Sequence, residues 1–223
     1  THQVFVNDER ITCRNFLCDS FSDKICVDNK ILPPAKNIYL MMNKPCDVVC
    51  TTTSDKKTLI YDLLPQELLN AENLGKIHTV GRLDYDTEGL IFLTTNGKFS
   101  NFIASPQTEI QKTYFVTLQN QVSSSQKQKY TELLEEGIFL PAENKSPAFT
   151  TKKATLIWKS DTECELTIQE GKFHQVKRMF AALGNSVAKL KRTKIGNIEL
   201  DKTLLPGEFR ALTLQELNSF IQN

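Results

Sequence analysis

The sequence is poor in the residues that metal centres and disulfide frameworks use, and it lacks a long apolar run. Its 223 residues include six cysteines and three histidines, with no C-x-x-C pair. This pattern argues against a zinc site and against a secreted disulfide scaffold. No apolar stretch approaches the roughly 18 residues of a membrane span, and no signal peptide is visible. We therefore expect a cytoplasmic protein with reduced thiols, no metal and no membrane contact.

The charges are balanced overall but unevenly distributed along the chain. The formal net charge is only +1. Residues 151–194, however, carry ten Lys and Arg side chains against four Asp and Glu side chains. Such asymmetry favours a basic face directed at a polyanion. A solvated charged surface without a partner is the alternative.

Hydrophobic periodicity and turn signals predict an α+β protein with a largely antiparallel mixed sheet and flanking helices. Strands and helices intermix without regular βαβ alternation, which disfavours a parallel sheet. A capping box at Ser123 and Gln126 and a stop at Gly137 mark one of the helices. The expected helices cover 123–136, 171–183 and 213–221, with helix-like sequence over 55–77, and the expected strands include 90–95, 156–158 and 164–168.

Residues 81–97, GRLDYDTEGLIFLTTNG, are the most informative stretch of the chain. A turn presents Asp84 next to Arg82, and an apolar run that follows reads as a buried strand ending in an Asn96-Gly97 turn. An aspartate held on a loop beside a buried strand is a candidate catalytic carboxylate. An Asp–Arg pair that only braces the turn is the alternative.

Two further segments carry groups suited to chemistry. Tyr114, in Lys112-Thr113-Tyr114, offers a flat face for stacking and a hydroxyl for proton transfer; a half-buried strand tyrosine is the alternative. In the helix predicted over 171–183, an apolar stripe faces the core, His174 and Arg178 point to the other side, and Lys177 lies at the border. A border lysine can reach a carboxylate and keep it ionised. A surface amphipathic helix fits the same periodicity.

The amino-acid sequences of these segments resemble motifs of one enzyme family. The string G-R-L-D-x-x-T-x-G-L resembles the catalytic loop of pseudouridine synthases of the RsuA/RluA superfamily, K-T-Y resembles a second motif of that family, and E-G-K-F-H-Q-V-K-R-M-F-A-A-L-G-N over 170–185 resembles its RsuA subgroup. The resemblance implies that Asp84, Tyr114 and Lys177 are catalytic. It also implies that Arg82 contacts RNA and helps to open the base stack.

Further RNA contacts are expected from cations and polar groups around these motifs. The basic run over 189–194 is suited to phosphates, which position RNA without reading its sequence. The expected RNA-binding residues are Arg82, Lys112, Lys172, His174, Gln175, Arg178, Lys189, Lys191, Arg192 and Lys194.

The chain divides near Pro33-Pro34 into two expected domains. Residues 1–35 resemble the second half of a small RNA-binding domain named for a ribosomal small-subunit protein, whose helical first half has no counterpart here. Residues 36–223 form the expected catalytic domain. Within it, Asp47 stands where the family usually has Gly, in an N-K-P-x-G segment. If the backbone has a positive φ there, Asp tolerates it better than most residues, at some cost.

The resemblance implies an RNA pseudouridine synthase acting on a uridine of 16S ribosomal RNA, flipped out of its stack. It implies no metal, nucleotide or organic cofactor, and we expect a monomer that binds ribosomal RNA or a small-subunit assembly intermediate. Two alternatives stay open: the same reaction on large-subunit (23S) rRNA, and a non-catalytic RNA-binding assembly factor of this fold. The joint presence of Asp84, Tyr114 and Lys177 argues against the pure binder.

Overall fold

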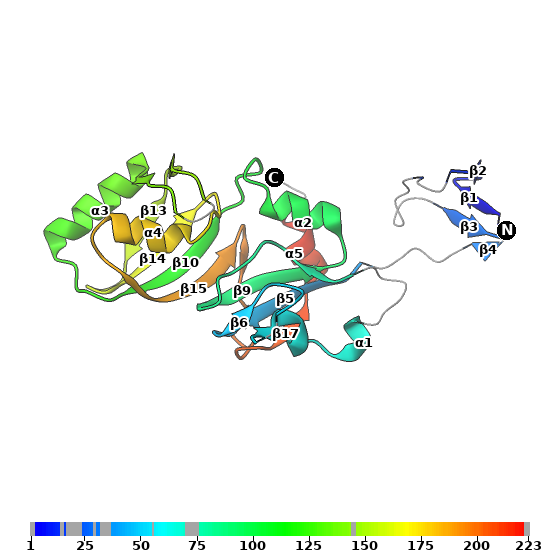
Figure 1. The fold of residues 1–223 in the computed structure, drawn as a ribbon, viewed down its shortest axis with the longest axis horizontal. Helices are drawn as coiled ribbons and strands as arrows, with labels where there is room; N and C mark the ends of the chain where they lie inside the picture. Colours follow the sequence, from blue (N-terminus) through cyan, green and yellow to red (C-terminus); the bar gives the residue numbers. More distant parts are fainter. Residues whose placement is uncertain are drawn as a thin grey trace.

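The computed structural model, shown in Figure 1, describes residues 3–13, 16, 24–28, 30–31, 37–54, 56–69, 76–143 and 146–220. A small antiparallel sheet near the N-terminus lies at one end of the long axis. Its strands, in spatial order, are β2 (Glu9–Ile11), β1 (Val4–Val6), β3 (Ile25–Val27) and β4 (Lys30–Ile31). Pro33-Pro34, where we placed the domain boundary, and Cys18 lie outside the described residues.

A mixed, mostly antiparallel sheet forms the body of the protein, as predicted. Its strands, in spatial order, are β13 (Thr155–Trp158), β14 (Glu163–Ile168), β10 (Lys112–Leu118), β15 (Val187–Ile195), β9 (Thr87–Thr94), β5 (Tyr39–Lys44) and β17 (Phe209–Ala211), with β16 (Ile198–Glu199) beside β15 and β8 (His78–Thr79) beside β9. The β9–β15 pair is parallel and the other pairs of this sheet are antiparallel. Two small pairs, β6 (Val48–Val49) with β7 (Thr58–Leu59) and β11 (Phe139–Leu140) with β12 (Phe149–Thr150), flank it.

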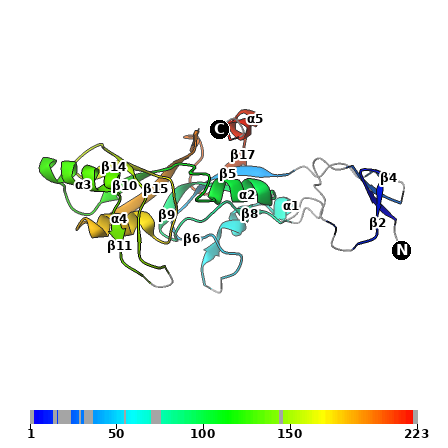
Figure 2. The same cartoon turned by 90° about the horizontal axis from the view of Figure 1, so that it is seen from above.

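Helices cover both faces of this sheet (Figure 2). They are η1 (Ile60–Leu63), α1 (Gln66–Leu69), α2 (Gly97–Ala104), α3 (Ser124–Glu136), α4 (Gln175–Ala182) and α5 (Leu214–Asn218). The capping box predicted for α3 is confirmed, and α5 begins with a second one formed by Thr213 and Glu216. None of the helices in the described part of the chain is long and apolar enough to cross a membrane.

Two local predictions were wrong or incomplete. Asn96-Gly97 is no hairpin turn: the Asn96 side chain accepts hydrogen bonds from the backbone of Lys98 and Phe99 and begins α2, a helix that the sequence reading missed. Asn-Gly suits both roles, because Asn is also a preferred N-cap residue. The segment expected to be helix-like over 55–77 contains β7, η1 and α1 in its described part.

Buried side chains alternate along β9, so the sheet separates two cores. Ile91 and Leu93 pack in one cluster with α3 and α4, whereas Leu90 and Phe92 pack in another near α2. All four are fully buried. The alternation follows from the two-residue repeat of a strand, and the strand therefore holds the preceding loop against a rigid frame.

Glycine is required where β9 meets β15. Gly89 has φ +99°, and a Cβ atom there would lie 2.2 Å from the backbone oxygen of Arg192. Only residues 87–89 of β9 pair with β15, and farther along β9 only Leu93 and Thr94 pair with β8, whereas β5 pairs with β9 over residues 89–94. The two halves of the sheet diverge there, and the pocket described below opens at this point.

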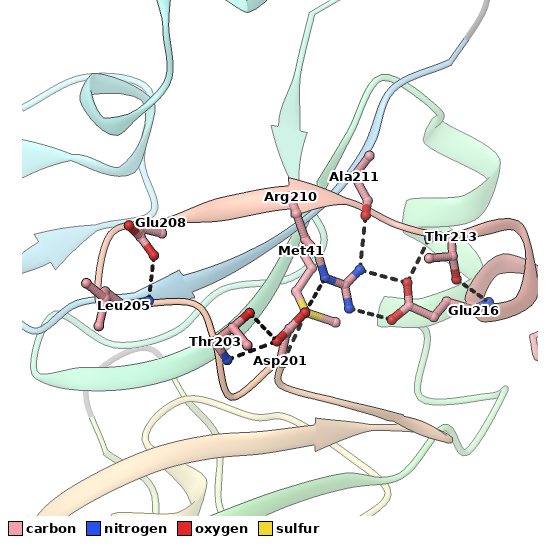
Figure 3. A network of polar contacts seen from close by, with 9 residues as sticks. All are labelled: Met41, Asp201, Thr203, Leu205, Glu208, Arg210, Ala211, Thr213 and Glu216. Carbon is pink, nitrogen blue, oxygen red and sulfur yellow. Dashed lines mark hydrogen bonds and ion pairs between the residues drawn. The ribbon is translucent and has the colours of Figure 1, made fainter.

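A polar network fixes the C-terminal segment to the sheet (Figure 3). Arg210 Nε donates to Asp201 at 2.6 Å, and its two terminal nitrogens donate to the carboxylate of Glu216 at 2.9 and 2.7 Å. Thr203 also donates to Asp201 through its hydroxyl and its backbone amide. These bonds hold the pKa of Asp201 at about 2. The network ties β17 and the start of α5 to the loop before them.

Candidate active site

A pocket between the divergent strands collects the predicted motifs. It is lined by the 81–84 turn, the end of α2, side chains of β10 and β15, and the segment that leads into α4. Asp84, Tyr114, Lys112, His174 and Arg192 all line it. Lys177 is not part of the lining, but it reaches Asp84 from α4.

A buried lysine holds the backbone of the Asp84 turn. The side chain of Lys44 is fully buried, and its Nζ donates to the carbonyl oxygens of Pro45, Asp84, Tyr85 and Thr87 at 3.0, 3.2, 3.4 and 2.9 Å. Burial lowers the pKa of Lys44, an effect that nearby thiols and carboxylates partly offset. The lysine replaces the solvent that these carbonyls would otherwise bind. It therefore fixes the backbone from which the Asp84 side chain projects.

The turn after β5 braces the same loop. The backbone amide of Asp47 donates to the carbonyl of Tyr85 at 2.9 Å. Asp47 has φ +62°, so the positive φ considered for this position is present. Asp adopts this left-handed conformation at lower cost than most residues.

A lysine and a histidine approach the carboxylate of Asp84. Lys177 Nζ lies 3.5 Å from its Oδ2, and His174 Nε2 lies 3.7 Å from its Oδ1. The predicted Asp84–Lys177 pair is therefore present. Lys177 also donates to Asp86 at 2.5 Å. Desolvation acts to raise the pKa of Asp86, but the hydrogen bond and charge of Lys177 outweigh it, so that the pKa is lowered.

The alternative in which Arg82 braces Asp84 is not supported. Arg82 is exposed at the pocket, and within the described part of the chain it forms no ion pair with Asp84. Its guanidinium is accessible to a ligand. His174 stands at the N-cap of α4 in a left-handed conformation, φ +48°, and its ring stacks on Phe173 at 3.8 Å between centroids.

Arg178 and Gln175 do not face outward as expected. Arg178 is 7% exposed and is bound by the β11–β12 region: its Nε lies 3.3 Å from Glu143, its Nη1 donates to Ser146 at 3.2 Å, and Nη2 donates to the carbonyl of Pro141. Gln175 is buried and bridges Glu170 and the backbone of Lys172. The side of α4 that the periodicity leaves polar is covered by protein, which accounts for the error.

The four cations of the basic run over 189–194 do not form one surface. Arg192 is 3% exposed and lines the pocket, as does Leu190. Lys191 and Lys194 line a groove with Phe115 on the other face of the sheet, and strand alternation places exposed Lys189 with Lys191. An irregularity in the β10–β15 register next to Thr113 adds to this separation. The prediction that these four cations share one phosphate-binding surface is therefore wrong.

The sequence reading missed three residues of this site. Lys44 belongs to the N-K-P-x-G segment and Asp86 to the 81–97 stretch. No local pattern distinguishes Lys44 as the donor to the Asp84 turn, or Asp86 as a second partner of Lys177. Phe173 is 41% exposed beside the pocket. An aromatic residue between Lys172 and His174, both expected to contact RNA, is the sequence signal that could have identified it.

Chemically, the site presents an ionisable carboxylate on a rigid turn, a cation beside it and an aromatic ring. No group of residues in the described ranges could hold a metal ion. Such a set can act on a sugar or a base by nucleophilic or acid–base chemistry.

Comparisons with solved structures first define the class. A crystal structure of a pseudouridylate synthase superposes with a TM-score of 0.74 at 38% identity, covering 97% of this chain and 88% of that one. The structure of an H/ACA RNP bound to a substrate RNA containing 2′-deoxyuridine matches at TM-score 0.52 and 16% identity, which is a likeness of fold alone. The predicted α+β fold is therefore confirmed as the pseudouridine synthase fold.

Sequence comparisons then give the family. The family model for RNA pseudouridylate synthase matches residues 38–182. Ribosomal small subunit pseudouridine synthase A of Pasteurella multocida is 45% identical over 202 residues, which cover 90% of this chain and 82% of that protein. The proteins of the same name from Haemophilus influenzae and Escherichia coli are 44% and 41% identical, each over 82% of this chain and 74% of theirs. The chain belongs to the RNA pseudouridylate synthase family, and the predicted enzyme class, an isomerase, is confirmed.

Proposed function

We propose that this enzyme converts one uridine of 16S ribosomal RNA to pseudouridine, with Asp84 as the essential group. The observation that carries the proposal is the placement of Asp84 in the pocket, with its carboxylate beside Lys177 and its backbone held by Lys44. The names of the relatives, which refer to the ribosomal small subunit, favour this RNA as the substrate.

Each of the remaining roles follows from position. Tyr114 lies on the buried face of β10 and lines the pocket, where its ring can stack on the flipped uracil. Lys177 stabilises the negative charge of Asp84. Arg82, Lys172 and His174 stand at the pocket and contact the RNA around the target nucleotide. The protein acts as a cytoplasmic monomer, without a metal or an organic cofactor.

The N-terminal sheet supplies a second RNA contact in this proposal. Its strand and turn pattern is the one that resembles part of a small RNA-binding domain, and its turns are built from Asn7, Asp8 and Asp28 with positive φ. Residues 1–35 then add affinity, while residues 36–223 carry the reaction.

Mapping of pseudouridine in ribosomal RNA from cells with and without this gene tests the proposal. We expect the loss of one 16S site, restored by the wild-type gene and not by Asp84→Asn. Loss of a 23S site instead would favour the large-subunit alternative. An unchanged map, together with RNA binding by the purified protein, would favour the assembly factor.

A further inference from the structure

Two buried cations lie in the pocket without a carboxylate partner. Lys112 is 7% exposed and Arg192 is 3% exposed, and both line the pocket with Asp84 and Tyr114. Within the described part of the chain, neither forms an ion pair. Lys112 Nζ donates to the carbonyl of Ile110 at 3.0 Å, and Arg192 Nε donates to that of Leu90 at 2.7 Å. Arg192 Nη2 is buried without any hydrogen-bond partner in this part of the chain.

This arrangement is costly unless a ligand completes it. Buried charges in proteins are normally paired, because leaving water costs several kcal/mol for each ion. Burial, and then the charge of Arg192, lower the pKa of Lys112 to about 8. The other titratable groups that line the pocket are Arg82, Asp84, Tyr114, Lys172 and His174. Near neutral pH the pocket thus holds two adjacent buried cations.

The strand register places both cations beside the ring that is proposed to stack on the base. Arg192 of β15 pairs directly with Tyr114 of β10, and residues directly opposite on one face have Cβ atoms about 4.5–5.5 Å apart. Lys112 precedes Tyr114 by two residues on the same buried face. A base lying on Tyr114 therefore has both cations within reach of its polar edge.

We propose that Lys112 and Arg192 form an anion site that binds the uracil ring and stabilises the negative charge it carries after it separates from the sugar. This inference deepens the proposed function and rests on it. A phosphate of the RNA backbone is the other anionic group available. The base is favoured because it enters the pocket when the nucleotide flips, whereas phosphates are strongly hydrated and stay with the exposed backbone.

The charge arises in a defined step. When the C1′–N1 bond breaks, its electron pair stays with the base and the negative charge spreads over N1, O2 and O4. The positive charge left at C1′ is compensated by Asp84. After the base turns, C5 bonds to C1′, the proton leaves C5 and N1 gains a proton, which restores a neutral ring. Buried donors that meet charge only after bond cleavage stabilise the transition state more than the bound substrate.

Lys112→Met tests the site, with Lys129→Met on the exposed face of α3 as the control. Tritium release from 16S rRNA labelled at uracil C5 gives the single-turnover rate at saturating enzyme, and filter binding gives Kd. We expect a rate at least about 100-fold lower and a Kd within about threefold of wild type. The control should match wild type in both. Arg192→Lys keeps the positive charge on a shorter side chain, so its single-turnover rate should fall less than that of Arg192→Met.

The melting temperature separates this role from a structural one. Removal of a buried, unpaired cation should raise Tm of the free protein, by about 2–4 °C. Because the folded-state pKa of Lys112 is lowered, its penalty is full below about pH 8 and fades as pH rises toward the unfolded pKa near 10.4. The Tm gain of Lys112→Met should therefore shrink over the same range. A lower Tm, or failure to fold, would identify Lys112 as a structural lysine and overturn the proposal.

Three further outcomes would overturn it. A saturated rate within threefold of wild type would show that no charge is stabilised there. A weaker Kd with a flatter salt dependence and an unchanged rate would assign the cations to a phosphate. Two further variants replace Lys112 with Arg, which keeps the positive charge, or with Gln, which does not. Equal rates in Lys112→Gln and Lys112→Arg would show that the charge is not used. Absence of tritium release from the wild-type enzyme, in contrast, would refute the proposed function itself.

Discussion

Lys44 Nζ donates a 3.2 Å hydrogen bond to the backbone carbonyl of Asp84, so a fully buried ammonium group holds the turn that carries the proposed catalytic carboxylate. The same nitrogen reaches three other carbonyls of the two adjoining turns. The orientation of Asp84 therefore depends on a residue 40 positions earlier in the chain, at the end of β5. This relationship makes Lys44 a positioning residue.

Lys44→Met should impair both stability and turnover. The substitution removes the ammonium group that donates to four backbone carbonyls, among them the buried carbonyl of Thr87. Leaving a buried acceptor unsatisfied costs about 1–3 kcal/mol, whereas the carbonyl of Asp84 keeps its bond from the Thr87 amide. We expect a lower Tm and a lower kcat, with KM for rRNA nearly unchanged because Arg82 and Lys172 remain in place. Thermal melts and tritium-release kinetics measure these effects, and Lys129→Met provides the control. A normal kcat in a folded Lys44→Met protein would contradict the positioning role.

Asp84→Asn should abolish turnover while the fold and RNA affinity persist. The change is isosteric and removes only the ionisable group, and the backbone bonds from Lys44 do not involve the side chain. Asp86→Asn is the matched control, because Asp86 also binds Lys177 but does not line the pocket. We expect more than about a 100-fold loss for the first variant and less than tenfold for the second. Activity of Asp84→Asn within tenfold of wild type would exclude its assignment.

Lys177→Met should reduce kcat by removing the cation 3.5 Å from Asp84. Two carboxylates then face each other without a shared cation, so we also expect Asp86 to lose the partner that lowers its pKa. The double variant Lys177→Met with Asp86→Asn should recover part of the loss, since one of the like charges is gone. Single-turnover rates of the three proteins measure this coupling. Strictly additive losses would indicate that Lys177 acts independently of Asp86.

The C-terminal network should make the stability of the fold decrease at low pH. The pKa of Asp201 is held at about 2 by bonds from Thr203 and Arg210, and that of Glu216 is lowered mainly by Arg210. Lowered carboxyl pKa values stabilise the fold above the unfolded values, about 3.9 and 4.3, and this contribution is lost as pH falls toward 2. Asp201→Asn should flatten the fall of Tm between about pH 4.5 and 2.5. The exposed ion pair of Asp161 with Lys127 offers the control, and Asp161→Asn should leave the profile unchanged.

Local sequence signals predicted elements well where one rule decided the structure. Ser123, Gln126 and Gly137 bound α3 through a capping box and a glycine with φ +94°, so its limits could be read directly. Asn96-Gly97 was ambiguous, because a hairpin and a helix start use the same residues. The choice was made by tertiary packing, since Ile103 of α2 belongs to the core on the Phe92 face of β9.

The site was predictable as a set of motifs but not as a surface. Asp84 and Lys177 were paired correctly, because a border position on a helix limits what a lysine can reach. Arg178 was misplaced because the β11–β12 region that covers it lies some 30 residues earlier in the chain. The run over 189–194 was misread because charges adjacent in sequence point to opposite faces of a strand. The contacts that bury Arg178 are long-range and leave no local signal, whereas the alternation along 189–194 is a local pattern.

The last prediction concerns where RNA affinity resides. Arg82 and Lys172 are exposed at the pocket. The side chains of Lys189, Lys191 and Lys194 lie on the opposite face of the sheet. Neutralising cations that contact phosphates should flatten the dependence of log K on log salt concentration by about 0.7–0.9 per contact. We expect Arg82→Gln with Lys172→Gln to flatten the slope by one to two units. The triple change of Lys189, Lys191 and Lys194 to Gln should alter it by less than about one.

Filter binding of 16S rRNA at several salt concentrations measures both slopes, with Arg192 left intact in each protein because it is buried in the pocket. The triple variant also retains Asp84, Lys177 and Tyr114, so its rate at saturating enzyme should equal that of wild type. Phosphate contacts position the substrate and do not react with it. A larger change of slope in the triple variant than in the double variant would mean that the RNA reaches the far face of the sheet. The surface expected from the sequence alone would then be a true contact, reached by RNA that passes around the edge of the sheet.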